Sequence, residues 1–254
     1  MIEAKTLSKR YNDRLVVQDV SLQIPRGGVT AIIGPNGAGK STLLSMISRL
    51  TPMSAGSVEI DGMDVTRTPG PELAKRLSIL RQHNQTSLRL SVRDLVAFGR
   101  FPHSGGRLSS EDQRHIDEAL DYLSLNEVQH RHLDELSGGQ RQRAYVAMVM
   151  CQDTDYVLLD EPLNNIDMRF AVDMMQLLRR AADEKGKTVV VVLHDINFAS
   201  CYSDHIIAMR GGKLAWQGTP DEVMRDEVLS DLYQIPMQVH ELNGQRICVY
   251  FRMG

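Results

Sequence analysis

The segment Gly34-Pro-Asn-Gly-Ala-Gly-Lys-Ser41 fits the pattern G-x-x-x-x-G-K-S/T, a glycine-rich turn that holds phosphate groups. The pattern is meaningful only between a strand and a helix, and the flanking sequence predicts both. Residues 29–33 form a short apolar run rich in β-branched side chains, and the apolar residues of 43–47 follow at helical spacing. An incidental Lys-Ser pair after a glycine turn would not need these neighbours. The segment therefore predicts the strand, loop and helix start of a P-loop fold.

The residue types in this segment suit a nucleoside triphosphate. Glycines let the backbone approach the phosphates without a Cβ clash, and the N–H groups at a helix start attract an anion. The Lys40 ammonium can reach the β- and γ-phosphates, and the Ser41 hydroxyl can bind Mg²⁺. The predicted phosphate loop comprises Gly34, Asn36, Gly37, Ala38, Gly39, Lys40, Ser41 and Thr42.

A second helix start with glycines lies at Leu136–Gln140, with the sequence LSGGQ. Ser137 and Gln140 have the spacing of a capping box, which by itself explains only that a helix begins there. Each glycine in a helix costs about 1 kcal/mol relative to alanine, so Gly138 and Gly139 indicate that something comes close to this backbone. The segment is therefore predicted to be a second anion site at a helix N-terminus.

Two more segments end predicted strands with side chains suited to phosphate chemistry. The run 156–159 leads into Asp160 and Glu161, and the valine-rich run 188–193 leads into His194. Paired acids at a strand end can simply start a loop, and a lone histidine there is usually just a polar terminus. Their order after the two glycine segments favours a functional role instead, with Asp160 holding Mg²⁺.

Composition is that of an ordinary globular chain. The 254 residues are 42% hydrophobic and 24% charged, and the net charge of −3 gives no general attraction to nucleic acid, so no nucleic-acid partner is expected. Three cysteines without close spacing argue against a disulfide framework or a metal cluster. The apolar run 189–193 is far shorter than the ~20 residues of a membrane span. Residues 1–14 lack the apolar region of a secretory signal. A membrane role would need a partner.

The remaining pattern predicts an α/β fold with a P-loop core, a mostly parallel sheet, a small antiparallel β subdomain and a helical insertion subdomain at about 88–150. Strands are predicted within 2–24 and 57–65, helices through the insertion, and a strand–helix–strand unit with a hairpin from 156 to 216. All of residues 1–254 are predicted to form a single domain. The tail, 223–254, is predicted to be a helix followed by a closing strand, too short for a separate regulatory domain.

Taken together, the four segments resemble the nucleotide-binding subunit of ATP-binding cassette (ABC) transporters, over about residues 2–222. In that family two subunits pair head to tail, and each ATP lies between one phosphate loop and the LSGGQ segment of the partner. The resemblance implies an ATP-dependent homodimer. It also implies that Ser137, Gly138 and Gly139 contact the γ-phosphate held by the other subunit's Lys40.

The same resemblance implies roles for residues near the phosphates. Glu161 resembles the general base that positions the attacking water, and His194 the switch histidine that contacts the γ-phosphate. Gln82 resembles the glutamine that binds Mg²⁺ and links the core to the helical insertion, with Gln85 as a rival. The implied metal ligands are Ser41, Gln82 and Asp160.

Two further positions carry over from the family. Tyr11 resembles the aromatic residue that stacks on adenine, although an exposed tyrosine between strands is the plain alternative. Asp167 ends a loop whose preceding residues, Asn164-Asn165-Ile166, depart from the common Ser-Ala-Leu wording. The retained aspartate implies communication between the two sites of a dimer.

The cargo is implied by a shorter stretch. Residues 91–103 resemble the ATPases of iron–siderophore importers, and haem and cobalamin importers share much of this wording. The resemblance implies a peripheral subunit on the cytoplasmic face of the cell (inner) membrane. Its partners would be integral-membrane permease subunits and, indirectly, a substrate-binding protein. The series Arg89, Arg93, Arg100 and Arg107 is either a solvated surface or a docking face for the permease.

Two other classes of protein are less consistent with the sequence. A non-transport ABC ATPase usually carries coiled-coil insertions, a duplicated cassette or basic arms, and the sequence has none of these features. A P-loop kinase would leave the LSGGQ segment and His194 without explanation.

Overall fold

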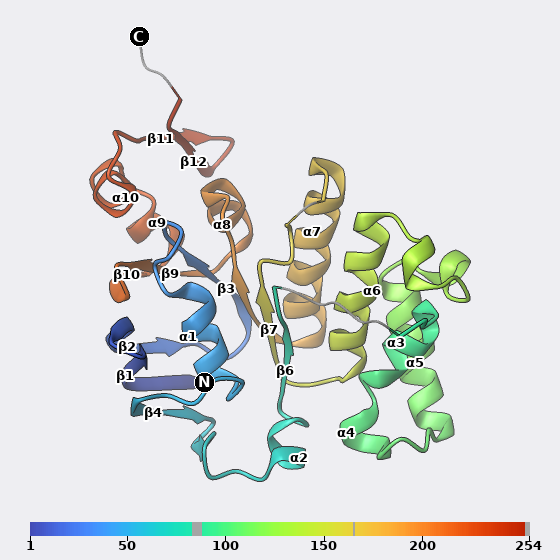
Figure 1. Ribbon diagram of the computed structural model, residues 1–254. Coiled ribbons are helices and arrows are strands. Elements are labelled where there is room, and N and C mark those ends of the chain that lie inside the picture. The colour runs from blue at the N-terminus through green and yellow to red at the C-terminus, as the bar shows by residue number, and fades with distance from the viewer. Residues whose placement is uncertain (83–87, 165, 252–254) are drawn as a thin grey trace.

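A central sheet organises the molecule, which is described here by a computed structural model covering all residues except 83–87, 165 and 252–254. Within these residues six strands form the sheet in the order β10-β9-β3-β8-β7-β6, and every neighbouring pair is parallel except β10 with β9. The strands are β3 Gly28–Ile33, β6 Leu77–Leu80, β7 Tyr156–Asp160, β8 Thr188–Val192, β9 His205–Arg210 and β10 Lys213–Gly218. Figure 1 shows this sheet running through the middle of the fold, with helices gathered beside it.

Two smaller sheets accompany it. Four of the described strands form an antiparallel sheet in the order β2-β1-β4-β5, and two form a hairpin near the C-terminus. Their bounds are β1 Ile2–Tyr11, β2 Arg14–Ile24, β4 Ala55–Ile60, β5 Met63–Asp64, β11 Gln238–Leu242 and β12 Gln245–Val249. The predicted α/β class, with a mostly parallel sheet and a small antiparallel one, is confirmed.

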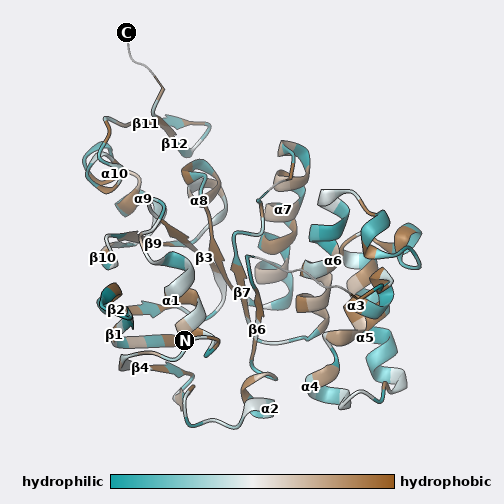
Figure 2. Cartoon of the chain, in the orientation of Figure 1, coloured by the Kyte–Doolittle hydropathy of each residue, from teal (hydrophilic) through white to brown (hydrophobic). Residues whose placement is uncertain are grey.

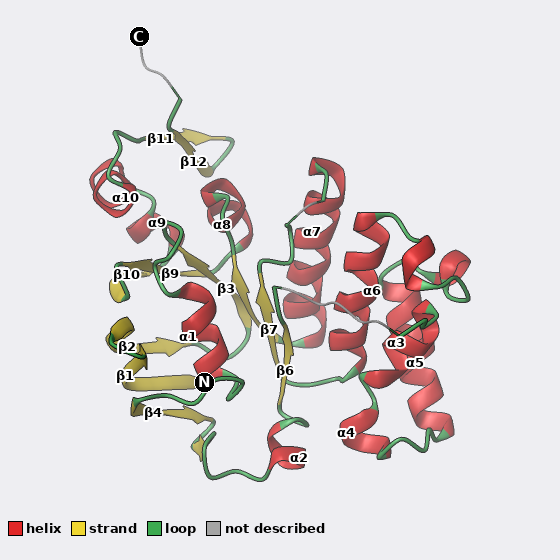
Figure 3. Cartoon of the chain, viewed as in Figure 1, coloured by secondary structure: helices red, strands yellow, loops and turns green. Residues whose placement is uncertain are grey.

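Five of the ten α-helices in the described part of the chain, α3 to α7, lie between β6 and β8 in the sequence, and Figure 3 shows them on one side of the strands. The helices are α1 Lys40–Ile47, α2 Gly70–Leu73, α3 Val92–Phe98, α4 Phe101–Ser104, α5 Ser110–Tyr122, α6 Gly138–Cys151, α7 Met168–Lys185, α8 Ile196–Tyr202, α9 Pro220–Val223 and α10 Asp226–Tyr233, with short 3-10 turns η1 Asn126–Val128 and η2 Leu133–Glu135. The capping box predicted at Ser137 is present, and Ser109 forms another at the start of α5. No helix in the described part of the chain has the length and apolar character needed to cross a membrane.

Each face of the central sheet is covered by its own apolar core. Along β8, Val189 and Val191 belong to the core on the helical side, whereas Val190 and Val192 belong to the core against α1 and the antiparallel sheet. This period of two explains why the buried strands read as continuous apolar runs, since both faces are covered. In Figure 2 these inner strands are coloured hydrophobic, in contrast to much of α5 at the periphery.

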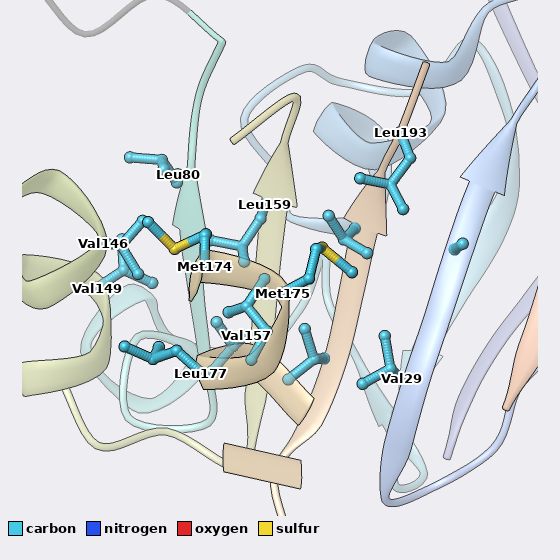
Figure 4. Packing of buried hydrophobic residues seen from close by; sticks show 14 of the residues in the cluster. Val29, Leu80, Val146, Val149, Val157, Leu159, Met174, Met175, Leu177 and Leu193 are labelled. Carbon is cyan, nitrogen blue, oxygen red and sulfur yellow. The ribbon is translucent and has the colours of Figure 1, made fainter. Parts of the chain in front are cut away.

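Helix α7 connects the helical insertion to the sheet. In Figure 4 its side chains Met174 and Leu177 lie between α6, which contributes Val146 and Val149, and the strand β7. All four are buried, so the insertion shares one continuous core with the central sheet. This packing determines where the helix start at Ser137 lies relative to the strand ends.

The arginine series of the insertion is not one surface. Arg100 is buried, and its Nε donates to Asp112 Oδ1 at 2.8 Å while a second guanidinium nitrogen donates to the Cys151 carbonyl at 3.1 Å. A docking role for Arg100 is therefore wrong, because its side chain is used inside the insertion. Hydrogen bonds from Ser109 and Arg100 hold the pKa of Asp112 well below its usual range. Arg93 pairs with Asp117, whose side chain is largely exposed.

The C-terminal segment folds back onto the core as helices and a separate hairpin. The helix predicted near 222–235 is split into α9 and α10, and the predicted closing strand is β12, which pairs only with β11 among the described strands. β12 does not extend the central sheet. It packs against α8 instead.

We expect Arg100→Leu to lower the free energy of unfolding by about 3–5 kcal/mol, because it leaves the Asp112 carboxylate buried without its partner. Arg93→Leu is the matched control and should cost no more than about 1 kcal/mol, since Asp117 is solvated. Urea unfolding of the full chain, followed by circular dichroism, compares the two. Equal losses would contradict a structural role for the buried pair.

Candidate nucleotide site

A pocket of about 610 Å³ opens at the edge of the central sheet where the parallel strands end. Residues that follow β3, β6, β7 and β8 line it, because parallel strands deliver their carboxyl ends to the same edge. Its lining residues are Arg14, Val16, Asn36, Gly37, Ala38, Gly39, Lys40, Ser41, Thr42, Gln82, Glu161, Asn164 and His194. The structure thus brings the predicted phosphate loop together with residues predicted more than 100 positions away.

Two glycines of the loop are required by its backbone. Gly34 has φ 138°, and a Cβ there would lie 2.0 Å from the Met209 carbonyl oxygen, so any side chain would collide with backbone. Gly39 has φ 95° and forms the N-cap of α1. The chain can therefore turn sharply out of β3 and start α1 with its first N–H groups facing the pocket.

Lys40 lies buried at the start of α1 with its ammonium folded over the loop. Its Nζ donates to the carbonyl oxygens of Gly34 at 2.8 Å and Pro35 at 3.1 Å. Burial lowers the pKa of Lys40, and the nearby carboxylates of Glu161 and Asp160 oppose that shift. A phosphate would offer this cation a charged partner in place of two neutral carbonyls.

Asp160 and Ser41 form a pair of oxygen ligands beside Lys40. The Ser41 hydroxyl donates to Asp160 Oδ1 at 2.8 Å, and the carboxylate is buried at the end of β7. Burial raises the pKa of Asp160; the hydrogen bond from Ser41 opposes this shift and the charge of Glu161 adds to it. A hard divalent cation would compensate this buried charge, and hydroxyl and carboxylate oxygens are the donors that Mg²⁺ prefers. These residues therefore fit Mg²⁺.

Glu161 is the most heavily contacted acid in the pocket. Gln82 Nε2 donates to its Oε2 at 2.5 Å, the Asn164 amide donates to the same oxygen, and His194 Nε2 lies 2.7 Å from Oε1. Burial alone would raise the pKa of Glu161, but the hydrogen bonds from His194, Asn164 and Gln82 outweigh it and leave that pKa lowered. The carboxylate is therefore ionised at neutral pH.

The backbone of Glu161 is also unusual. Its φ of 52° places a residue with a side chain in the left-handed region, which costs on the order of 1 kcal/mol or more. This turn directs the side chain toward Gln82 and His194, whereas Asp160 reaches Ser41. In this way Asp160 and Glu161, although adjacent in the sequence, contact different partners.

The second glycine-containing helix start lies outside this pocket. Ser137 caps α6, accepting a hydrogen bond from the Gln140 amide at 3.2 Å, and both Ser137 and Gly138 are exposed. A Cβ at Gly139 would lie 3.0 Å from the Phe170 ring. Packing within the chain thus accounts for Gly139, while Ser137 and Gly138 present an open helix N-terminus to solvent.

Comparison with known proteins identifies the family. The model of the ABC transporter family matches residues 17–164, which contain the phosphate loop, the LSGGQ segment and the paired acids. The chain belongs to the ABC transporter family. It is an ATPase of the ATP-binding cassette type.

Its relatives among ABC proteins match over nearly their whole length. The petrobactin import ATP-binding protein YclP of Bacillus subtilis (strain 168) is 50% identical over 251 residues, covering 99% of this chain and 100% of the relative. The petrobactin import ATP-binding protein FatE of Bacillus anthracis is 52% identical over 250 residues, covering 98% and 100%. A solved dimeric ATP-binding cassette in a post-hydrolysis state, bound to ADP and Pi, is 29% identical with a TM-score of 0.77, covering 87% of this chain and 99% of that one.

Two residues that the ABC resemblance singled out lie away from the pocket lining. Tyr11 ends β1 and is 47% exposed, and the Lys9 ammonium lies 4.8 Å from its ring centroid. Arg14, which pairs with Tyr11 across the hairpin, does line the pocket. Asp167 caps α7 by accepting from the Phe170 amide at 3.0 Å. Gln85 lies outside the described residues.

Three pocket residues had no predicted site role. Asn164 stands three residues after Glu161, close enough for its amide to turn back onto that carboxylate, and this spacing is a usable sequence signal. Arg14 and Val16 come from β2 of the antiparallel sheet. No local pattern predicts them, because their place depends on how that sheet packs against the phosphate loop.

Proposed function

We propose that this ABC protein is the ATP-hydrolysing subunit of an iron–siderophore importer. The observation that carries the ATPase part is the arrangement of Glu161, held by Gln82 and His194, across the pocket from Lys40 and Ser41. A phosphate-transfer site needs groups that bind the phosphates, a positioned base and ligands for a metal ion. The pocket brings residues suited to all three roles together.

ATP would place its phosphates against the start of α1. The N–H groups of the loop and Lys40 would bind the β- and γ-phosphates, and Ser41, Asp160 and Gln82 would hold Mg²⁺. The bound Mg²⁺ would neutralise charge on the phosphate oxygens. Lys40 would then exchange its carbonyl contacts for phosphate oxygens.

Glu161 would position and deprotonate the water that attacks the γ-phosphate. Its carboxylate is ionised, so it can accept a proton at neutral pH without a preceding titration. Three donors now occupy its oxygens, and at least one of them has to turn away for a water to bind. His194, which is exposed, is the donor best placed to move to the γ-phosphate.

The second half of each site would come from another copy of the chain. The start of α6, with Ser137 and Gly138 exposed and uncovered, offers N–H groups to an anion that its own phosphate loop cannot place there. The solved cassette with 29% identity is described as dimeric with ADP and Pi bound, which supports this pairing. An isologous ATP-bound dimer would close two such sites.

The permease would dock on the helical insertion. Large apolar side chains are exposed around α3 and α4: Leu88, Phe98, Phe101 and Leu108. Exposed apolar clusters of this kind mark protein–protein contacts. The protein would then sit peripherally on the cytoplasmic face of the membrane, and a substrate-binding protein would deliver cargo to the permease from the other side.

The proposal that the cargo is an iron–siderophore complex is based on the relatives of this chain. The names of YclP and FatE both state petrobactin import, at identities of 50% and 52% over almost the whole chain. Haem and cobalamin importers remain the alternative cargo classes, because the ATPase itself does not contact the cargo.

Cells that lack this chain should lose uptake of radiolabelled iron–siderophore and recover it when the gene is restored. Complementation with Glu161→Gln should fail, because import requires hydrolysis. Haem and cobalamin uptake measured in the same cells serve as controls and should not change. Loss of haem or cobalamin uptake with normal siderophore uptake would reassign the cargo and leave the ATPase intact.

Glu161→Gln should retain ATP binding and lower turnover by about 100- to 10,000-fold, since the amide keeps the shape but cannot accept the proton. Steady-state phosphate release and binding of a fluorescent ATP analogue measure the two properties separately. Glu118→Gln, an exposed change on α5, is the control and should behave as wild type. Near-normal turnover in Glu161→Gln would remove Glu161 from the mechanism.

ATP should convert the Glu161→Gln protein from one subunit to two, because the closed dimer binds nucleotide through both halves of each site. Adding Ser137→Arg should prevent this shift, since a bulky cation would occupy the exposed start of α6. Ser110→Arg introduces the same side chain at the exposed start of α5 and should leave dimerisation unchanged. Light scattering with and without ATP measures the number of subunits in each variant. If the Ser137→Arg protein forms dimers normally, the LSGGQ segment acts only as a helix cap.

A further inference from the structure

The C-terminal hairpin holds helix α8 through a side-chain amide. Asn197 Nδ2 donates to the Cys248 carbonyl at 3.2 Å, and the Cys248 amide donates to Asn197 Oδ1 at 2.8 Å. Both ends of one amide group are thus paired with one residue of β12. A turn further along α8, the Ser200 hydroxyl donates to the Arg246 carbonyl at 2.6 Å. β12 therefore follows α8 and is bonded to it near both ends.

The hairpin is itself anchored, so it is a support and not a loose appendage. Arg246 Nε donates to Asp221 Oδ1 at 2.7 Å in α9, and the Val239 amide donates to Asp226 Oδ1 at 2.7 Å in α10. Cys248 is buried. The position of β12 is thereby tied to the helices that follow the central sheet, and α8 is tied to β12.

On another side, α8 borders empty space. A pocket of about 200 Å³ lies beside Phe198 of α8, and Glu161 and His194 contribute to its wall. The remaining wall comes largely from the loop before α7 and that helix's first turns, including Leu163, Ile166 and Met168. The Phe198 side of α8 faces this pocket, whereas Ile196 and Ala199 are buried in the core. The hydrogen bonds to β12 therefore fix the position of α8 together with these core contacts.

We propose that Asn197 is a positioning residue for His194: by fastening α8 to β12, it keeps the His194 imidazole at the nucleotide pocket, beside Glu161, from where it can turn to the γ-phosphate. The inference deepens the proposed ATPase mechanism and rests on it. Asn197 follows His194 by three residues, and between them Asp195 caps α8 and Ile196 is buried. A shift of α8 is therefore transmitted to His194. Asn197 is not among the described residues that line the nucleotide pocket, so its effect on turnover is indirect.

The test uses Asn197→Ala in the full chain. We expect turnover at saturating ATP to fall about tenfold or more, since small displacements of a reacting group are costly. Affinity for a fluorescent ADP analogue should stay within about twofold, because the phosphate loop is not on α8. Asp226→Ala is the matched control: it removes one hydrogen bond of the hairpin but leaves the Arg246–Asp221 anchor and both bonds to Asn197, so turnover should stay near that of wild type. Equal loss in both variants would indicate general damage to the hairpin and would overturn the proposal.

A double-mutant cycle separates positioning from mere stability. If Asn197 acts through His194, then Asn197→Ala should cause no further loss of turnover in a His194→Ala protein. Fully additive losses would overturn the proposal. If the wild-type protein itself shows no ATP turnover, the proposed function is refuted instead.

Hydrogen exchange provides a readout that needs no nucleotide. The peptide covering 193–202 should exchange faster in Asn197→Ala than in wild type, and in Asp226→Ala it should not. Thermal unfolding of each variant confirms that the chain is folded during the measurement. Unchanged exchange across α8 would mean that β12 does not hold the helix, and the proposal would fall whatever the turnover.

Discussion

The parallel pairing of β3, β8, β7 and β6 is the constraint on which the site depends. Ile32 pairs with Val192, Val192 with Asp160, and Leu159 with Leu80, so four strands end at one level. The residues that follow each strand then meet without any further adjustment. The phosphate loop, Gln82, Glu161 and His194 are distant in sequence and share one pocket for this reason. Two apolar cores, one on each face, hold the strands in that register.

Within the pocket, burial and hydrogen bonding shift the pKa values of the adjacent residues Asp160 and Glu161 in opposite directions. Asp160 is buried with a single hydroxyl donor, and its raised pKa reflects a charge that a cation would stabilise. Glu161 is buried with three donors, and its lowered pKa reflects a carboxylate already stabilised by the protein. One acid is thus suited to a metal and the other to a water. The left-handed backbone of Glu161 lets the two side chains point to different partners, at a local cost in conformational energy.

The elements outside the core have different relations to this site. The helical insertion shares the core of the central sheet through α7, and its buried Arg100–Asp112 pair belongs to its internal structure, not to its surface. The start of α6 remains open to solvent. The C-terminal hairpin approaches from the other end of the chain and bonds to α8, directly after His194. Of these segments, the hairpin is bonded to the helix that follows His194, whereas the start of α6 lies outside the pocket.

The sequence by itself determined the fold class, the phosphate loop and the acids at the strand ends, because these depend on local rules. Glycine conformation, strand period and helix capping act over a few residues, and each of them is present in the structure as predicted. Only the tertiary structure decided which residues touch. The burial of Arg100, the closeness of Gly139 to Phe170, the pocket lining by Arg14 and Val16, and the hairpin on α8 join segments far apart in the chain. Such contacts depend on how separate elements pack, and no single stretch of sequence determines that packing.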